Sequence, residues 1–129
     1  MFATTKAFSG FAVDDIDAAK AFYGETLGIP TTLLDEENGL LTLHLAGGRD
    51  TLIYRKPDFM PATYTILNFP VDNIEAAVDE LSAKGVELER YDGFGQDERG
   101  IAREAGPPIA WFTDPAGNVL AVIEDAGES

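Results

Sequence analysis

The sequence carries one seven-residue phrase twice, and this repeat constrains the fold more than any other feature. The first copy, VDDIDAA, begins at Val13, and the second, VDNIEAA, begins 58 residues later at Val71. A repeat of about half the chain is too long for one solenoid unit, and it suits a duplicated supersecondary module. Two facing copies of a module leave a cleft between them, where small molecules bind. The repeat therefore predicts two tandem modules with a ligand site between them.

Composition is that of one globular domain spanning residues 1–129, with 45% hydrophobic and 25% charged residues. A chain of this length can bury a stable hydrophobic core without disulfides or bound metal ions. The absence of cysteine excludes disulfides, thiolate metal sites and cysteine nucleophiles. The sequence has no stretch of membrane-spanning length, and its start, MFATTKAF, lacks the layout of a secretory signal. We therefore expect a cytoplasmic protein that binds no membrane.

The charge balance is strongly acidic, with 23 acidic against 9 basic residues and a formal net charge of −14. Nucleic acids and anionic membranes are recognised by clustered Lys and Arg, so neither is an expected partner. A cationic ligand would be attracted, although salt screens this attraction within about 8–10 Å. A solvated acidic surface that keeps the protein soluble is the simpler interpretation.

Each repeated phrase has the pattern of a strand that ends at the start of a helix. Asp14 and Asp72 follow the strand valines and are expected to cap the helices, with Glu75 completing a capping box in the second half. Both helices are expected to stop at glycine, Gly28 and Gly85, which suit the left-handed residue after a helix.

Three short β-like segments follow each helix, so each half is predicted to be β-α-β-β-β. The segments are 31–35, 40–46 and 50–56 in the first half, and 86–91, 108–113 and 118–124 in the second. Module one then covers about 5–56, the proline-containing linker 57–62, and module two about 63–124. Residues 92–107, rich in Gly, Asp and Glu, are expected to form a mobile loop, and such loops are often functional lids.

The segment WFTDPAGN, residues 111–118, is a strand that ends, turns and restarts. Asp114 can close an Asx-turn, Pro115 presets φ for the turn, and Gly117 allows a positive φ. These roles account for the segment fully, so Asp114 is expected to be structural and not catalytic.

Paired βαβββ modules, the helix end FYGETLG at 22–28 and the WFTDPAGN hairpin together resemble the vicinal-oxygen-chelate superfamily, the glyoxalase / bleomycin-resistance / extradiol-dioxygenase group. The resemblance extends from about Lys6 to Glu124. It implies an α+β fold in which two tandem βαβββ modules form an incompletely closed, mixed β-barrel-like cleft. It also implies a homodimer.

Enzymes of this group hold a divalent metal with four His, Glu or Gln side chains. The resemblance places those positions at Phe8, Ile66 and Ala121, with the fourth near Leu52 to Tyr54, best aligned at Ile53. Apolar side chains cannot donate an electron pair to such a cation, so we expect no metal and no other cofactor. The one histidine, His44, is expected to be a partly exposed strand residue, and the acidic clusters to be solvated surface.

Strand alternation predicts which residues line the cavity. Small residues at Gly10 and Ala12 leave room for a ligand, although a cavity filled by its own side chains is the alternative. The resulting site is apolar and aromatic with a few polar points. The candidate ligand-binding residues are Phe8, Tyr54, Tyr64, Ile66, Asn68, Trp111 and Ala121.

These features favour a metal-independent small-molecule-binding protein of the glyoxalase/bleomycin-resistance type, which sequesters an apolar, aromatic or cationic drug or metabolite. The alternative is a lyase-, isomerase- or dioxygenase-like enzyme of the same superfamily with a non-standard site. It would use Tyr54, Tyr64 or Asp97 as acid or base, but no His–carboxylate arrangement is visible at suitable spacing. A domain that binds another protein would instead expose an apolar patch.

Overall fold

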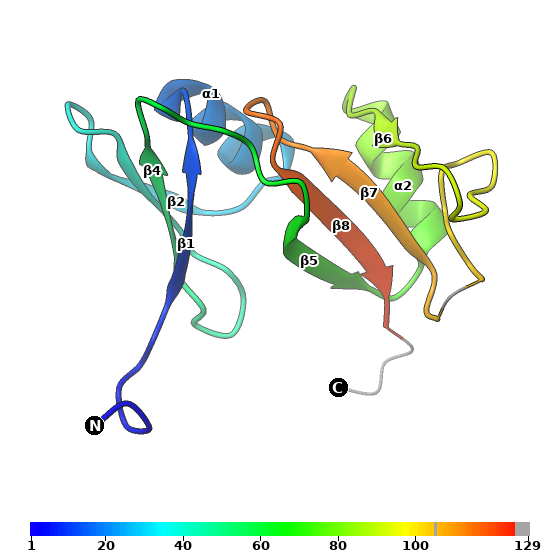
Figure 1. Ribbon diagram of the computed structural model, residues 1–129, viewed down its shortest axis with the longest axis horizontal. Coiled ribbons are helices and arrows are strands. Elements are labelled where there is room, and N and C mark those ends of the chain that lie inside the picture. Colours follow the sequence, from blue (N-terminus) through cyan, green and yellow to red (C-terminus); the bar gives the residue numbers. More distant parts are fainter. Residues whose placement is uncertain (105, 126–129) are drawn as a thin grey trace. The chain divides into compact units, whose positions relative to one another are not determined.

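The computed structural model describes residues 1–104 and 106–125, which form two compact units, one of residues 1–61 and one that begins at Ala62. The elements of the first unit are β1 (Ser9–Val13), α1 (Ile16–Lys20), η1 (Ala21–Thr26), β2 (Thr31–Asp35), β3 (Leu40–Leu43) and β4 (Thr51–Arg55). Those of the second are β5 (Thr65–Val71), α2 (Ile74–Ala83), β6 (Leu88–Glu89), β7 (Ile109–Thr113) and β8 (Val119–Glu124) (Figure 1). The predicted order of one strand, one helix and three strands is confirmed in both halves.

Each unit folds around one four-stranded mixed sheet, and the two sheets have the same topology. The strand orders are β1-β4-β3-β2 and β5-β8-β7-β6. In each sheet the first and last strands of the module are parallel neighbours, and the other pairs are antiparallel. The repeated phrase therefore marks two copies of one βαβββ fold, and the α+β prediction is confirmed.

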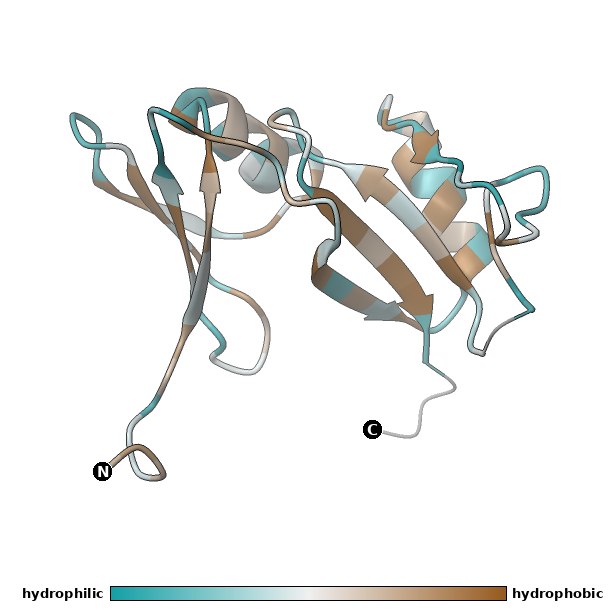
Figure 2. Cartoon of the chain, viewed as in Figure 1, coloured by the Kyte–Doolittle hydropathy of each residue, from teal (hydrophilic) through white to brown (hydrophobic). Residues whose placement is uncertain are grey.

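One face of each sheet packs against the helix of its own unit, because apolar residues alternate along the strands. In the first unit Phe11, Val13 and Ile53 are buried on this face, together with Tyr23 of η1. In the second unit the buried residues are Ile74, Val78, Leu81, Ala110, Phe112, Leu120 and Val122. Strand β8 is brown along most of its length in Figure 2, whereas the loop after β6 is largely teal. We call the other face of each sheet, which its own helix does not cover, the open face.

The helices begin one residue later than the sequence analysis predicts. The side chain of Asp15, not Asp14, accepts hydrogen bonds from the amides of Asp17 and Ala18 at 3.0 and 3.1 Å. Asn73 accepts from the amide of Ala76 at 3.1 Å. The predicted caps were therefore wrong, because each repeat places two polar residues before its helix and the second one has the extended backbone of a cap.

Replacing Asn73 by Ala should lower the free energy of unfolding by about 1 kcal/mol, because the N-cap hydrogen bond is lost. The matched control is Asp72→Ala, which removes an exposed neighbour and should change stability by less than about 0.5 kcal/mol. Urea unfolding followed by fluorescence measures both variants. Equal losses for the two variants would contradict the assignment of the cap.

Both helical segments end at the predicted glycines, since Gly28 has φ of 73° and Gly85 has φ of 85°. The first helix changes to π geometry at η1, and the amide of Leu27 donates to the carbonyl of Phe22 at 2.9 Å, five residues back. Within residues 1–104 and 106–125, no helix has the length and apolar character needed to cross a membrane.

Candidate functional site

Three of the predicted ligand-binding residues lie in one row on the open face of the second sheet. Asn68 of β5 is the register partner of Ala121 of β8, which is in turn the partner of Trp111 of β7. Glu89 of β6 continues the row beside Trp111. Register partners present their side chains on the same face of a sheet. The row therefore places an amide, the fully buried Ala121, an indole and a carboxylate side by side.

Two further aromatic rings gather at Trp111. The ring centroid of Phe94 lies 5.1 Å from that of Trp111, and the centroid of Tyr91 lies 5.5 Å from it. Tyr91 and Phe94 are themselves 6.2 Å apart, so the three rings form one cluster. The sequence analysis missed Tyr91 and Phe94. A signal for Phe94 was present in the sequence, because it is an aromatic residue within the glycine-rich stretch DGFG.

The phenol of Tyr91 keeps its proton in this cluster. Burial raises the pKa of Tyr91, and the nearby Glu89 carboxylate raises it further. A neutral phenol is a hydrogen-bond donor as well as an acceptor. Tyr91 therefore adds a polar point to a largely apolar platform.

The other four predicted ligand-binding residues do not belong to this row. Ile66 lies at a β-bulge between Thr65 and Leu67, which interrupts the regular alternation of β5. Tyr64 precedes β5 and Phe8 precedes β1, and both side chains are exposed. Tyr54 is exposed on the open face of the first sheet. Phe8 and Tyr54 belong to the first unit, and their place in one site with residues of the second unit stays a prediction.

Ile53, which the resemblance aligns best with the fourth metal-ligand position, lies on the helix-covered face of its sheet. Ile53 is the register partner of Phe11 and is fully buried on the face that packs against the helix. Leu52 and Tyr54 lie on the open face instead, because each step along a strand changes the face.

A family-type metal ion does not fit the residues present. The positions that the resemblance assigns to the ligands hold Phe8, Ile53, Ile66 and Ala121, which all have hydrocarbon side chains. Among residues 1–104 and 106–125, no group of three or more His, Cys, Asp or Glu side chains is placed to hold a metal.

Side-chain hydrogen bonds anchor the middle of the loop that follows β6. The side chain of Gln96 donates to the carbonyls of Glu89 and Gly100 at 2.8 Å each, and its oxygen accepts from the amide of Tyr91 at 2.6 Å. Ile101 is fully buried. These bonds fix the loop beside β6, where it supports the aromatic cluster.

Asp97 closes the middle of this loop. Burial raises the pKa of Asp97, but hydrogen bonds from the amides of Ile101 and Arg99 and from the Arg103 guanidinium lower it, and the net pKa lies below its ordinary value. A carboxylate with a lowered pKa is a weak general base. The geometry therefore gives Asp97 a structural role and disfavours the acid–base role considered from the sequence.

The loop arginines are paired with carboxylates of α2. Arg99 Nε donates to Asp79 Oδ1 at 3.0 Å, and Arg103 Nη2 donates to Glu75 Oε2 at 2.9 Å. Glu75 thus binds Arg103 and does not complete the expected capping box. These pairings hold the loop to the helix, so neither guanidinium is placed to receive an anionic ligand.

His44 has polar partners that sequence spacing did not reveal. Its Nδ1 lies 3.1 Å from Asp50 Oδ1, and its Nε2 lies 2.7 Å from Thr32 Oγ1. The structure therefore contains a His–carboxylate pair that was not visible from the spacing of residues in the sequence. Partial exposure of His44 is confirmed.

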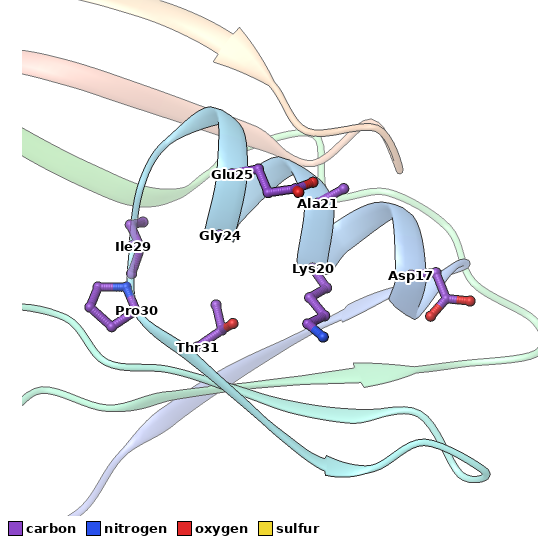
Figure 3. Close-up of a pocket in the computed structure, with 8 residues that line it drawn as sticks. All are labelled: Asp17, Lys20, Ala21, Gly24, Glu25, Ile29, Pro30 and Thr31. Atoms are coloured by element: carbon purple, nitrogen blue, oxygen red, sulfur yellow. The ribbon is translucent and has the colours of Figure 1, made fainter.

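Two surface grooves lie away from the predicted site. One, of about 450 Å³, is bounded by the α1–η1 helix and the start of β2 (Figure 3), and its lining includes Asp17, Lys20, Glu25 and Thr31. The other, of about 600 Å³, lies within the second unit along α2 and includes Asp79, Arg90 and Arg99. None of the predicted ligand-binding residues lines either groove. Both are charged, so neither matches the apolar site that the sequence predicts.

Comparison with known proteins gives one family and a fold shared with many solved structures. A family model described as Glyoxalase/Bleomycin resistance protein/Dioxygenase superfamily matches residues 7–122. A search of curated proteins found no match.

Three similar solved structures differ in what their names describe. A glyoxalase/bleomycin resistance protein/dioxygenase superfamily member from Sphaerobacter thermophilus DSM 20745 has 22% identity and a TM-score of 0.72, with 95% of this chain and 99% of that chain covered. TnmS3, an antibiotic binding protein from Streptomyces sp. CB03234, has 23% identity and a TM-score of 0.69, with 94% and 97% covered. FosX, a fosfomycin resistance protein from Listeria monocytogenes, has 13% identity and a TM-score of 0.70, with 97% and 96% covered.

The family model spans nearly all of both modules, and the solved structures share the fold over nearly their whole length. The resemblance inferred from the repeat, the helix end and the hairpin is therefore confirmed. This chain belongs to the glyoxalase/bleomycin resistance protein/dioxygenase superfamily.

Proposed function

We propose that this protein binds an apolar or aromatic small molecule without a metal ion and sequesters it, as a drug- or metabolite-binding protein does. The observation that carries the proposal is the cluster of Trp111, Tyr91 and Phe94 on the open face of the second sheet, beside Asn68 and Ala121. Aromatic rings supply flat contact area, and a few polar groups orient the ligand. Hydrocarbon side chains at the family's metal-ligand positions support binding without a metal.

The charge distribution supports a cationic aromatic ligand. Glu89 lies beside Trp111 in the same row, and the chain carries a net charge of −14. A cation over an aromatic face gains about 0.5–2 kcal/mol. TnmS3, an antibiotic binding protein, has the same fold, which supports a role in small-molecule binding. The homodimer implied by the resemblance is part of this proposal.

A thermal-shift panel on the untagged protein tests the proposal. One arm contains Mg²⁺, Mn²⁺, Ni²⁺ and Zn²⁺, and the other contains proflavine, a planar aromatic cation, with simple aromatic acids. A ligand at about 100 times its Kd stabilises the folded state by about 2.7 kcal/mol, which is a visible rise in Tm. We expect proflavine to raise Tm in the presence of a chelator. A rise with metal ions alone would overturn the proposal.

A further inference from the structure

Three polar side chains, one from β2 and two from the loop between β3 and β4, form a hydrogen-bonded chain in the first unit. Thr32 lies on β2, an edge strand, while His44 directly follows β3 and Asp50 directly precedes β4. The hydroxyl of Thr32 is 2.7 Å from His44 Nε2, and Asp50 Oδ1 is 3.1 Å from His44 Nδ1. The three residues are brought together by strand pairing, and none of them belongs to the aromatic cluster of the second unit.

The partners of His44 fix which ring nitrogen carries the proton. A carboxylate only accepts hydrogen bonds, so Nδ1 must donate to Asp50 and must carry the hydrogen. In the neutral imidazole Nε2 then holds a lone pair, and the Thr32 hydroxyl must donate to it. A hydroxyl that donates to a histidine held by a carboxylate is the arrangement of an activated oxygen nucleophile.

We propose that Thr32, His44 and Asp50 form a second site, which accepts an acyl group from a small uncharged carboxylic ester. Thr32 Oγ1 attacks the carbonyl carbon and forms the new C–O bond, while its proton passes to His44 Nε2. The bond to the leaving alcohol then breaks, and His44 returns the proton to that alcohol. Water attacks the acyl-threonine by the same route, which releases the carboxylic acid and restores the Thr32 hydroxyl.

The surroundings select the class of ester. The side chains of His44 and Asp50 are 40% and 56% exposed, so an ester can reach the Nε2–Oγ1 pair from solvent. A net charge of −14 disfavours an anionic acyl donor. Gly47 and Gly48 lie in the turn between His44 and Asp50, and we expect their backbone amides to bind the oxyanion. A β-bulge between Leu33 and Asp35 also follows Thr32, and bulges recur next to active sites.

Hydrolysis of p-nitrophenyl acetate by the full chain tests the proposal, with release of p-nitrophenol as the readout. Thr32→Val should lower the protein-dependent rate by about 100-fold or to the buffer rate, and Thr32→Ser should retain activity. The matched control is Thr42→Val, since Thr42 is the register partner of Thr32 on the same face and has no part in the proposed chemistry. Mass spectrometry of acid-quenched protein should find the acetyl group on the peptide that contains Thr32.

Asp50 is a positioning residue in this site, and its test is the pH profile. The wild-type rate should fall at acid pH, because a protonated imidazole cannot take the Thr32 proton. His44→Gln should remove this dependence, and Asp50→Asn should lower the rate and change the profile while the protein stays folded. A wild-type rate in Thr32→Val, or acetyl groups found only on lysine or tyrosine, would overturn the proposal. Proflavine binding is unaffected in either case, so failure here is distinguishable from failure of the proposed function.

Discussion

Replacing Asp114 by Ala should cost about 3 kcal/mol of stability, a loss that exceeds that of most single substitutions. Asp114 and Asn118 are only 4% and 2% exposed in the β7–β8 turn. The Asp114 carboxylate accepts from the backbone amide of Asn118 at 2.8 Å and from its side-chain amide at 3.1 Å. The substitution removes a charged acceptor and leaves buried donors without it, and each buried donor so deprived costs about 1–3 kcal/mol.

The effect should extend beyond the turn, because Asn118 has a second role. Its side-chain oxygen accepts from the amide of Ala62 at 3.2 Å, which ties the start of the second unit to the turn. Urea unfolding followed by the fluorescence of Trp111, the one tryptophan in the sequence, measures the loss. The control is Asp92→Ala, which removes an exposed acid and should change stability by less than about 0.5 kcal/mol. A loss of that small size for Asp114→Ala would show that the turn does not depend on the carboxylate.

The turn also shows why much of the fold could be predicted from the sequence. Asp114, Pro115 and Gly117 form a local signal, and local backbone preferences do not depend on distant residues. The same is true of strand alternation, by which Phe11 and Val13 lie on the same buried face of β1. Errors of one residue occur at the two helix caps, which lie at Asp15 and Asn73 instead of Asp14 and Asp72. Each arises where neighbouring residues are chemically similar and only the register of the backbone distinguishes them.

Only those features of the site that depend on the alternation along a single strand could be predicted from the sequence. Alternation placed Asn68 and Ala121 on one face, and the pairing of β7 with β8 adds Trp111 to the same row. Phe94 comes from a loop without periodicity, and its contact with Trp111 depends on the bonds that fold the loop. Thr32 and His44 are 12 residues apart and meet only because β2 pairs with β3. Contacts of this kind require the sheet register, which the sequence does not contain explicitly.

Removing Phe94 should weaken the binding of proflavine by about 10- to 30-fold, because an aromatic face at the centre of a binding cluster contributes about 1.4–2 kcal/mol. Phe94 is a better first target than Trp111. Its side chain is 45% exposed in a loop, so Phe94→Ala should leave the fold intact, whereas Trp111 lies within β7. The control is Phe2→Ala, which removes an aromatic ring that is 87% exposed near the N-terminus.

The measurement is a fluorescence titration with proflavine, in which quenching of Trp111 reports contact with the cluster directly. Trp111→Phe should retain most of the affinity, since it keeps an aromatic face, but it should remove the tryptophan signal. The fluorescence of proflavine itself then gives the Kd for that variant. Equal affinity in Phe94→Ala and Phe2→Ala would move the binding site away from the Trp111 cluster. A loss of affinity confined to Phe94→Ala would instead place the binding site at the cluster of Trp111, Tyr91 and Phe94.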